Sequence, residues 1–228
     1  MPGKVAIVQS AYIPWKGLFD MINMVDTFIF FDSVQFTKRS WINRNRIKSP
    51  FGDRWITVPV HGSTTKKIDE VEIKNQEWEK SHFDSLKQSY IKSPYWKDVE
   101  SIIEPIYGEN LRYISEVNQT FIKSISSYLG IKTDFLNSSD IDQKGKKSER
   151  LISIMENIGA DSYLSGPAAK NYIGDEFTQA GIDLQWMDYS GYPVYSQPHG
   201  DFRHDVTVLD LIASCGHDTP SHIWGWRS

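Results

Sequence analysis

Residues 35–48 concentrate the basic side chains that could bind an anion, although the whole chain carries a net charge of −4. The five cations of this segment are Lys38, Arg39, Arg44, Arg46 and Lys48. If the segment is extended, Arg44 and Arg46 face one way, and the amides of Asn43 and Asn45 face the other way. Guanidinium groups bind phosphate or carboxylate oxygens in a bidentate manner. The pattern therefore predicts either an anion-binding strand or a charged surface strand, and the substrate-binding candidates in it are Gln35, Lys38, Asn43, Arg44 and Arg46.

A second group of candidates lies between the first expected strand and the first expected helix. It consists of Gln9, Tyr12, Trp15 and Lys16. In parallel sheets, ligands bind beyond the carboxyl ends of the strands and beside helix N-termini. We therefore expect Gln9 to hydrogen-bond a ligand and Lys16 to contact a phosphate. Tyr12 and Trp15 could stack on a sugar or a base, or they could simply close the end of the sheet in a tight turn.

Three further places carry polar residues after expected strands. Asp32 ends the second strand, where its carboxylate could act as a general base, hydrogen-bond a ribose or an amine, or cap a helix or turn. His61 follows the third expected strand and is the next candidate for the base. Ser165, Gly166 and Asn171 belong to a strand-to-helix turn whose amides could bind an anion. An ordinary turn is the alternative there.

Other chemistry-bearing residues give no recognisable motif. No His or Cys spacing is typical of a zinc site, and no Walker A, G-x-G-x-x-G or G-x-S-x-G motif is present, so the sequence does not identify a cofactor. Cys215 is the single cysteine, which excludes an intrachain disulfide and fits a reducing compartment. Asp210 lies between apolar neighbours in an expected helix, where it could accept a bond from a buried donor or pair with Arg44 or Arg46.

Composition limits the classes of function. A pI near 5.9 argues against a dedicated nucleic-acid-binding protein. The sequence has neither a signal-peptide-like apolar region at its start nor a run of about 20 apolar residues that could span a bilayer. We therefore expect a cytoplasmic protein with no integral membrane segment and no nucleic-acid partner.

The elements that must position these residues follow from apolar runs and periodicity. Strands are expected at 5–8, 27–31, 55–60, 71–73, 134–136, 162–164 and 184–187, and helices at 16–25, 77–90, 96–107, 111–129, 148–157 and 206–215. The first strand, helix and second strand form a βαβ unit, which implies a parallel sheet. We predict an α/β fold with a Rossmann-like parallel sheet, flanking helices and a helical insertion at about 77–129. The whole chain, 1–228, is expected to be one domain, with a polar loop at 139–147.

Several motifs together resemble the WbqC-like family. They are Gln9, Tyr-Ile-Pro-Trp-Lys-Gly-Leu-Phe at 12–19, Asp-Ser-Val-Gln-Phe-Thr-Lys at 32–38, Asn-Arg-Asn-Arg-Ile-Lys at 43–48, Trp-Ile-Thr-Val-Pro-Val at 55–60, Tyr-Leu-Ser-Gly at 163–166 and Val-Leu-Asp-Leu at 208–211. Ser10 stands where the family usually has proline. The resemblance implies a bacterial protein from surface-polysaccharide loci, such as O-antigen clusters. It also implies transfer of an amino acid, often glycine, onto an amino sugar carried by a nucleotide.

A weaker resemblance concerns the mechanism. The order of strand, 12–19 motif, helix and strand ending in Asp32 is similar to nucleotidyltransferases with an H-x-G-H signature, such as pantothenate synthetase. Trp15 and Leu18 stand where that signature has histidines. The resemblance therefore implies a related fold without adenylation by the usual histidine pair, and amide formation from an already activated acyl donor.

These observations lead to one preferred function and two alternatives. The preferred function is acylation of the amine of a nucleotide-linked amino sugar, with the arginine segment on the diphosphate and Asp32 as base. The partners would be that sugar and an acyl or amino-acid donor. The alternatives are a non-catalytic binding protein for a nucleotide sugar or glycan intermediate, and an ATP-dependent adenylate-forming ligase. We expect Gln9, Asp32, Asn43 and Arg44 to converge in one cleft at the carboxyl edge of the sheet.

Overall fold

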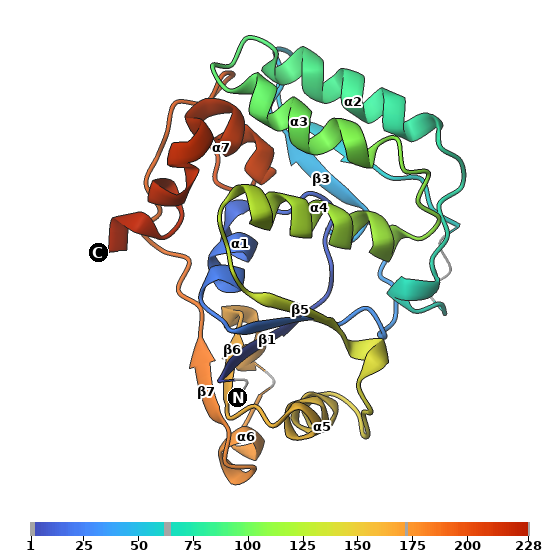
Figure 1. Ribbon diagram of the computed structural model, residues 1–228, viewed down its shortest axis with the longest axis vertical. Helices are drawn as coiled ribbons and strands as arrows, with labels where there is room; N and C mark the ends of the chain where they lie inside the picture. Colours follow the sequence, from blue (N-terminus) through green and yellow to red (C-terminus); the bar gives the residue numbers. More distant parts are fainter. Residues whose placement is uncertain (1–2, 62–64, 172, 228) are drawn as a thin grey trace.

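A five-stranded parallel sheet forms the centre of the protein (Figure 1), which we describe from a computed structural model of residues 3–61, 65–171 and 173–227. The strand order is β5-β2-β1-β6-β7. The strands are β1 (Lys4–Val8), β2 (Thr27–Phe30), β5 (Asp134–Asn137), β6 (Ser162–Ser165) and β7 (Asp183–Trp186). Helices flank the sheet, so the predicted α/β fold with a Rossmann-like parallel sheet is confirmed.

The two central strands are apolar because both of their faces are covered. All four residues of β2 are buried, as are the three inner residues of β1. The register aligns Val5 with Thr27 and Val8 with Phe30. Near-continuous apolar runs are typical of strands inside parallel sheets. The edge strands β5 and β7 are only partly buried and carry more polar residues.

The helices that connect the strands lie on opposite faces of the sheet. On one face lie α1 (Lys16–Asn23) and α4 (Ile114–Tyr128), and on the other lie α5 (Ser148–Ile158) and α6 (Glu176–Gln179) (Figure 1). The chain leaves β1 through α1 toward β2, and it returns from β5 through α5 to β6 on the other side of β1. The strand order therefore reverses between β1 and β6, and such switch points are where open α/β sheets bind ligands.

A two-stranded antiparallel ribbon stands outside this sheet. It pairs β3 (Arg44–Ile47) with β4 (Arg54–Thr57) and places Arg46 opposite Trp55. The strand expected at 55–60 thus ends earlier and belongs to the ribbon. The edge strand expected at 71–73 is wrong: these residues form only isolated bridges, from Ile73 to Val60 and from Glu72 to Tyr113.

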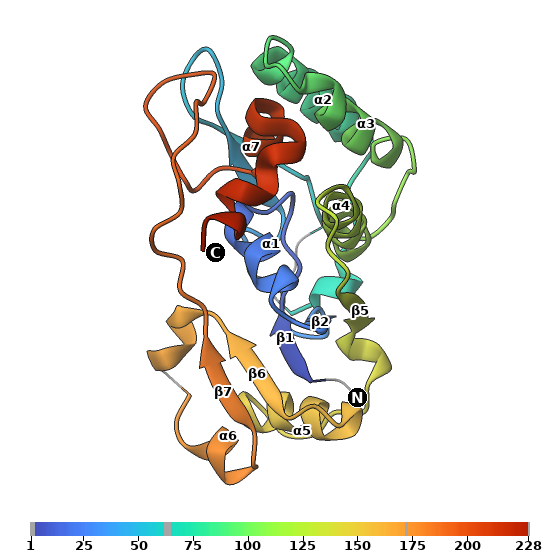
Figure 2. The same ribbon diagram turned by 60° about the vertical axis from the view of Figure 1, so that its left-hand side comes forward.

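Helices α2 (Glu77–Tyr90) and α3 (Trp96–Ile106) lie beyond the ribbon and, with α4, fill the stretch expected to be helical. After β7, the chain runs along one side of the molecule to the ribbon and turns into α7 (Val208–Cys215), which packs on α3 (Figure 2). The backbone N–H of Thr207 donates to Arg46 O, and that of Val208 donates to Pro14 O. Short 3-10 helices complete the described chain at Ile68–Glu70, Ser138–Asp140, Pro167–Asn171, Gly216–His222 and Gly225–Arg227.

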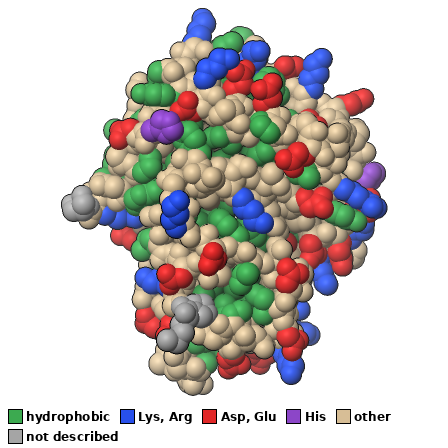
Figure 3. All heavy atoms as spheres, in the orientation of Figure 1, with side chains coloured by type: hydrophobic (Ala, Val, Ile, Leu, Met, Phe, Trp, Pro, Cys, Tyr) green, Lys and Arg blue, Asp and Glu red, His purple; other side chains and the backbone are tan. Residues whose placement is uncertain are grey.

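The surface mixes both signs of charge. On the face drawn in Figure 3, Lys and Arg side chains are interspersed with Asp and Glu. None of the helices formed by the described residues combines the length and the apolar composition needed to cross a bilayer.

Candidate functional site

A cleft of about 1080 Å³ opens at the carboxyl ends of β1 and β6, at the switch point of the sheet. Its floor comes from the end of β1 with the following loop, and from the end of β6. The N-terminal ends of α1 and α5 form two of its walls, and residues 40–42 form a third. A cleft of this volume lies at the upper end of the range for small-molecule sites.

The loop between β1 and α1 supplies both a polar and an aromatic wall residue. Gln9 is exposed and lines the cleft, and its side chain bonds to no other described residue. Trp15 also lines the cleft, with its ring packed edge-on against Tyr189 at 5.0 Å between centroids. Gly17 makes this position possible, because a Cβ there would lie 2.2 Å from Cζ2 of Trp15. The first turn of α1 is thus shaped around the Trp15 indole.

Tyr12 lies in the core and does not line the cleft, which corrects the stacking role expected for it. Its side chain is fully buried, and its hydroxyl bonds to His82 Nδ1 at 2.8 Å and Tyr107 Oη at 2.7 Å. Burial raises the pKa of Tyr12 and lowers that of His82 to about 4. The aromatic ring therefore fastens the loop to the helices that follow the ribbon.

The amides of the basic segment also hold the backbone. Asn45 Nδ2 donates to the carbonyl oxygens of Tyr12 and Ile13, at 3.1 and 2.6 Å. Asn43 is buried, does not line the cleft, and donates to Val58 O at 3.1 Å. Ile13 has a left-handed φ of 40°, which a non-glycine residue adopts only under constraint. These contacts explain how the loop keeps that conformation.

Asp32 lies at the same sheet edge but behind the wall of the cleft. Its carboxylate is buried and accepts bonds from the N–H of Ser10 at 2.9 Å and from Gln119 Nε2 at 3.1 Å. Burial raises the pKa of Asp32, and the bonds from Ser10 and Gln119 oppose that shift. Ser10 belongs to the wall of the cleft but is itself fully buried, and its hydroxyl also helps to lower the pKa of Asp32. Ser10 thus separates Asp32 from the cleft, and its hydroxyl accepts a bond from Asn118 Nδ2 at 3.1 Å.

Lys16 is buried under the C-terminal tail and does not line the cleft. Its ammonium donates to Pro193 O at 3.3 Å and lies over the rings of Tyr192 and Tyr195, at 4.9 and 5.4 Å from their centroids. Burial lowers its pKa to about 8. The expected contact of Lys16 with a phosphate is therefore not available in this arrangement.

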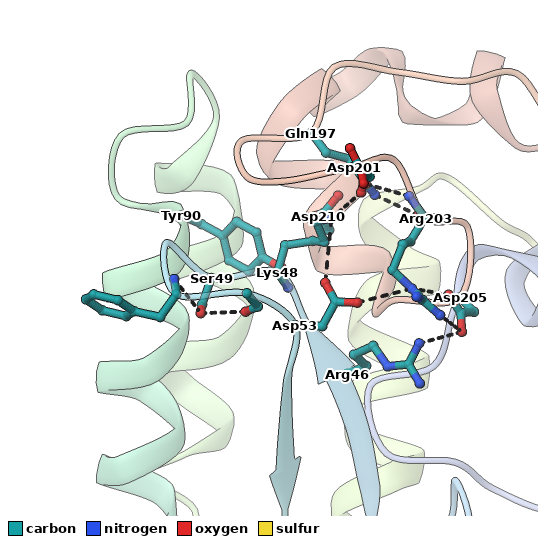
Figure 4. Close-up of polar contacts among 12 residues, drawn as sticks. Arg46, Lys48, Ser49, Asp53, Tyr90, Gln197, Asp201, Arg203, Asp205 and Asp210 are labelled. Carbon is teal, nitrogen blue, oxygen red and sulfur yellow. Dashed lines mark hydrogen bonds and ion pairs between the residues drawn. The ribbon is translucent and has the colours of Figure 1, made fainter.

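The arginines of β3 face outward as the alternation predicts, and both lie over the Trp55 ring, with their Cζ atoms 4.3 and 4.9 Å from its centroid. Arg46 pairs with Asp205 at 2.7 Å, and Asp205 also accepts from Arg203 (Figure 4). Lys48 is buried. Its ammonium donates to Asp201 O and lies 3.6 Å from the Asp53 carboxylate. These contacts fasten the C-terminal tail across the ribbon.

Arg44, unlike Arg46 and Lys48, has no ion-pair partner among the described residues. Its guanidinium lies over the Trp55 ring, 4.3 Å from the centroid. No carboxylate in the described part of the chain pairs with it, and its buried Nε finds no acceptor there. Arg44 does not line the cleft itself.

The other expected candidates divide between the cleft and the outer surface. Ser165 and Gly166 line the cleft at the end of β6. Outside the lining lie His61, Gln35, Lys38 and Asn171, all of them exposed. Asp210, in α7, accepts a bond from the Tyr195 hydroxyl at 2.8 Å, so it serves a buried donor and pairs with neither arginine.

The cleft also contains residues that the sequence analysis did not single out. They are Trp41, Lys147, Ser148, Arg150 and Asp205. For Lys147, Ser148 and Arg150, the sequence does carry a signal: a basic stretch at the start of an expected helix. Backbone N–H groups and cations at such a place favour the binding of an anion. Within the described chain, neither Lys147 nor Arg150 pairs with a carboxylate, and Arg150 Nε is buried without an acceptor.

The chemistry of the cleft is that of an organic anion site. Most of its surface is apolar, with Trp15, Trp41 and Phe31 in its walls, and its uncompensated cations gather at the start of α5. Its carboxylate, Asp205, has a pKa lowered chiefly by its bonds from Arg203 and is therefore a poor base. Among the described residues, no three His, Cys, Asp or Glu side chains are grouped so that they could hold a metal ion.

Comparison with known proteins places the chain among relatives of the same length. Residues 9–222 match the model of the WbqC-like protein family. The chain is similar to the uncharacterized protein Rv1507c of Mycobacterium tuberculosis (strain ATCC 25618 / H37Rv), with 41% identity over 224 residues that make up 96% of this chain and 97% of that relative. No solved structure matches the chain.

Proposed function

The chain belongs to the WbqC-like protein family, and we propose that it is a transferase that acylates the amine of a nucleotide-linked amino sugar, with an amino acid such as glycine as the acyl group. The reaction would serve the synthesis of a bacterial surface polysaccharide and take place in the cytoplasm. The observation that carries this proposal is the cleft at the switch point between β1 and β6, which joins a largely apolar wall to uncompensated cations.

The cations at the start of α5 are the proposed site of the diphosphate. Lys147 and Arg150 lie at one end of the cleft, at the N-terminal end of α5, which no described side chain caps. Charge-assisted hydrogen bonds to phosphate are the strong ones in proteins. The arginines of β3 are less suitable than the sequence suggested, because Arg46 is bound to Asp205 and Arg44 lies outside the cleft.

The amine must be neutral when it attacks an acyl carbon, so a base is required near the sugar. Asp32 is the proposed base, since burial raises its pKa and it lies directly behind Ser10, a residue of the cleft wall. The Ser10 hydroxyl, which is fully buried here, would turn toward the cleft to accept the proton of the ammonium while passing its own proton to Asp32. Gln9, whose exposed amide bonds to no other described residue, would hydrogen-bond the sugar.

A non-catalytic carrier of nucleotide sugars is the second candidate. The observation that favours it is the position of Asp32 behind Ser10, which leaves Asp205, with its lowered pKa, as the carboxylate in the described wall of the cleft. A carrier needs the apolar wall and the cations, but not a base.

The test is an acylation assay with UDP- or dTDP-linked 4-amino-sugars. The protein is incubated with each sugar and either an acyl thioester or glycine with ATP, and mass spectrometry detects the added acyl group. A transferase forms the amide from the thioester, and Asp32→Asn should lower kcat by about 10²–10⁴-fold with little change in KM. The matched control is Asp98→Asn, which should keep full activity. Asp98 lies on α3, and its carboxylate accepts a bond from the Tyr128 hydroxyl.

The same assay separates the alternatives. Binding of the sugars without product from any donor would refute the transferase and favour the carrier. Product only with ATP, together with exchange of pyrophosphate into ATP, would identify an adenylate-forming ligase instead. Full activity of Asp32→Asn would remove Asp32 as the base.

A further inference from the structure

Two exposed tryptophans form an aromatic surface at the mouth of the cleft. The rings of Trp41 and Trp55 lie 5.2 Å apart at an angle of 41°. Their side chains are 47% and 39% exposed, which is unusual for residues that are normally largely buried. Trp41 also belongs to the lining of the cleft, so this surface continues the cleft outward.

Arg44 gives the same surface a positive charge. Its guanidinium lies over the Trp55 ring, as does that of Arg46, but Arg46 is already paired with Asp205. Within the described chain, no carboxylate neutralises Arg44, and its Nε has no acceptor. Lys38 and Arg39, which precede Trp41 in the chain, are exposed cations as well. An aromatic surface with this charge suits a flat ligand that carries an anion better than it suits a neutral sugar.

We propose that Trp41, Trp55 and Arg44 form a stacking subsite that binds the nucleobase of a nucleoside diphosphate. The base would lie on the exposed face of Trp41, and the phosphates would extend into the cleft toward Lys147 and Arg150. The choice of a nucleotide rests on the proposed function, whereas the subsite itself rests on the exposed rings and the unpaired guanidinium. Stacking of a base on an aromatic side chain tolerates different bases, because every base offers a flat face.

The side chain of Trp41 can be changed without removing the contact that places its backbone. That contact is the bond from the Tyr12 N–H to Trp41 O, at 2.9 Å, which does not involve the indole. Phe51 offers a matched control, because it lies in the turn of the same ribbon, is 86% exposed and does not line the cleft.

The experiment measures the binding of UDP and of inorganic pyrophosphate by isothermal titration calorimetry. Trp41→Ala should weaken UDP binding by about 5- to 150-fold, the range for loss of one base–aromatic stack. Pyrophosphate has no base, so its affinity should change by less than about twofold, within the usual effect of a distant surface substitution. Trp41→Phe keeps a flat ring and should restore most of the UDP affinity, and Phe51→Ala should bind UDP as the wild type does.

Three results would overturn the proposal. They are unchanged UDP affinity in Trp41→Ala, an equal loss for UDP and pyrophosphate, and a wild type that binds none of UDP, dTDP and ADP at millimolar concentration. The experiment needs no acyl transfer. A protein that binds UDP through Trp41 but forms no amide would refute the transferase and leave the subsite intact. A transferase with the same KM for the nucleotide sugar in Trp41→Ala would do the reverse.

Discussion

A single methyl group at Gly17 should disturb the cleft. A Cβ built at this position lies 2.2 Å from Cζ2 of Trp15 and 2.6 Å from Cε2 and Cη2. The indole would have to move, although Tyr189 and Tyr192 pack against it at 5.0 and 6.1 Å between ring centroids. Overpacking of this kind costs about 1–3 kcal/mol. The better helix propensity of alanine offsets up to about 1 kcal/mol of that cost, so we expect Gly17→Ala to lose about 1–2 kcal/mol of unfolding free energy.

A double-mutant cycle with Trp15→Leu isolates the clash. Once the indole is gone, Gly17→Ala should be neutral or stabilising, because only the propensity gain remains. Urea denaturation of the four proteins gives the unfolding free energies, and titration with a nucleotide sugar shows whether the displaced indole weakens binding. Effects of Gly17→Ala that agree within about 0.5 kcal/mol in the two backgrounds would refute the reasoning, since independent sites add to that accuracy.

Gly166→Ala is the matched control for Gly17→Ala. Gly166 also lines the cleft, but a Cβ there would meet no atom within 4 Å. Its φ is not in the left-handed region. We therefore expect its stability to change by less than about 0.5 kcal/mol, as for substitutions that meet no specific feature. Equal destabilisation by the two alanines would mean that the loss at Gly17 has nothing to do with Trp15.

Two further predictions concern the cations of the cleft and a buried carboxyl group. Arg150→Gln should weaken nucleotide-sugar binding by about 1.5–3 kcal/mol, as expected for loss of a charged hydrogen bond. Arg112→Gln, which alters a surface arginine paired with Glu72, should leave the affinity unchanged. Equal affinities of the two variants in a binding titration would contradict the proposed phosphate site. Burial raises the pKa of Asp210 from 3.8 to about 6, so the folded state holds this proton more tightly and stability falls as the pH rises from about 4 through about 6, by up to about 3 kcal/mol. Asp210→Asn should remove that fall in unfolding experiments across this pH window, and a variant with the same slope as the wild type would show that another group causes it.

Strands and helices were predictable from the sequence where a single local pattern of apolar and polar residues determines them. The apolar runs of β1 and β2 identify buried parallel strands, and the alternation of Asn and Arg in residues 43–46 predicts two opposite faces, as the structure shows. The edge strand expected at 71–73 was wrong because the sequence Val-Glu-Ile fits a short strand as well as it fits isolated bridges. Secondary structure of that length is settled by its tertiary partners.

The site was less predictable because its geometry depends on strand order and on distant partners. Tyr12 looks the same in sequence as a ligand-stacking residue, and only its bonds to His82 and Tyr107 place it in the core. The place of Arg150 in the wall of the cleft follows from the position of β6 beside β1, which no local pattern contains. Trp41 lies within the basic segment, where the charged residues provide the stronger sequence signal, so the sequence analysis did not name it as a candidate.

The wall of the cleft combines residues from both ends of the chain. Asp205 lies there with the tail held to the ribbon by Arg46 and to α1 by a second contact, which involves a buried carboxylate. In that contact, the fully buried Asp20 carboxylate accepts bonds from Arg227 at 2.7 Å and from the Tyr192 hydroxyl at 2.5 Å. Loss of one partner would leave an uncompensated buried charge, which is strongly destabilising. The N-terminal βαβ unit alone therefore cannot form this cleft, which is consistent with a family match that extends over residues 9–222.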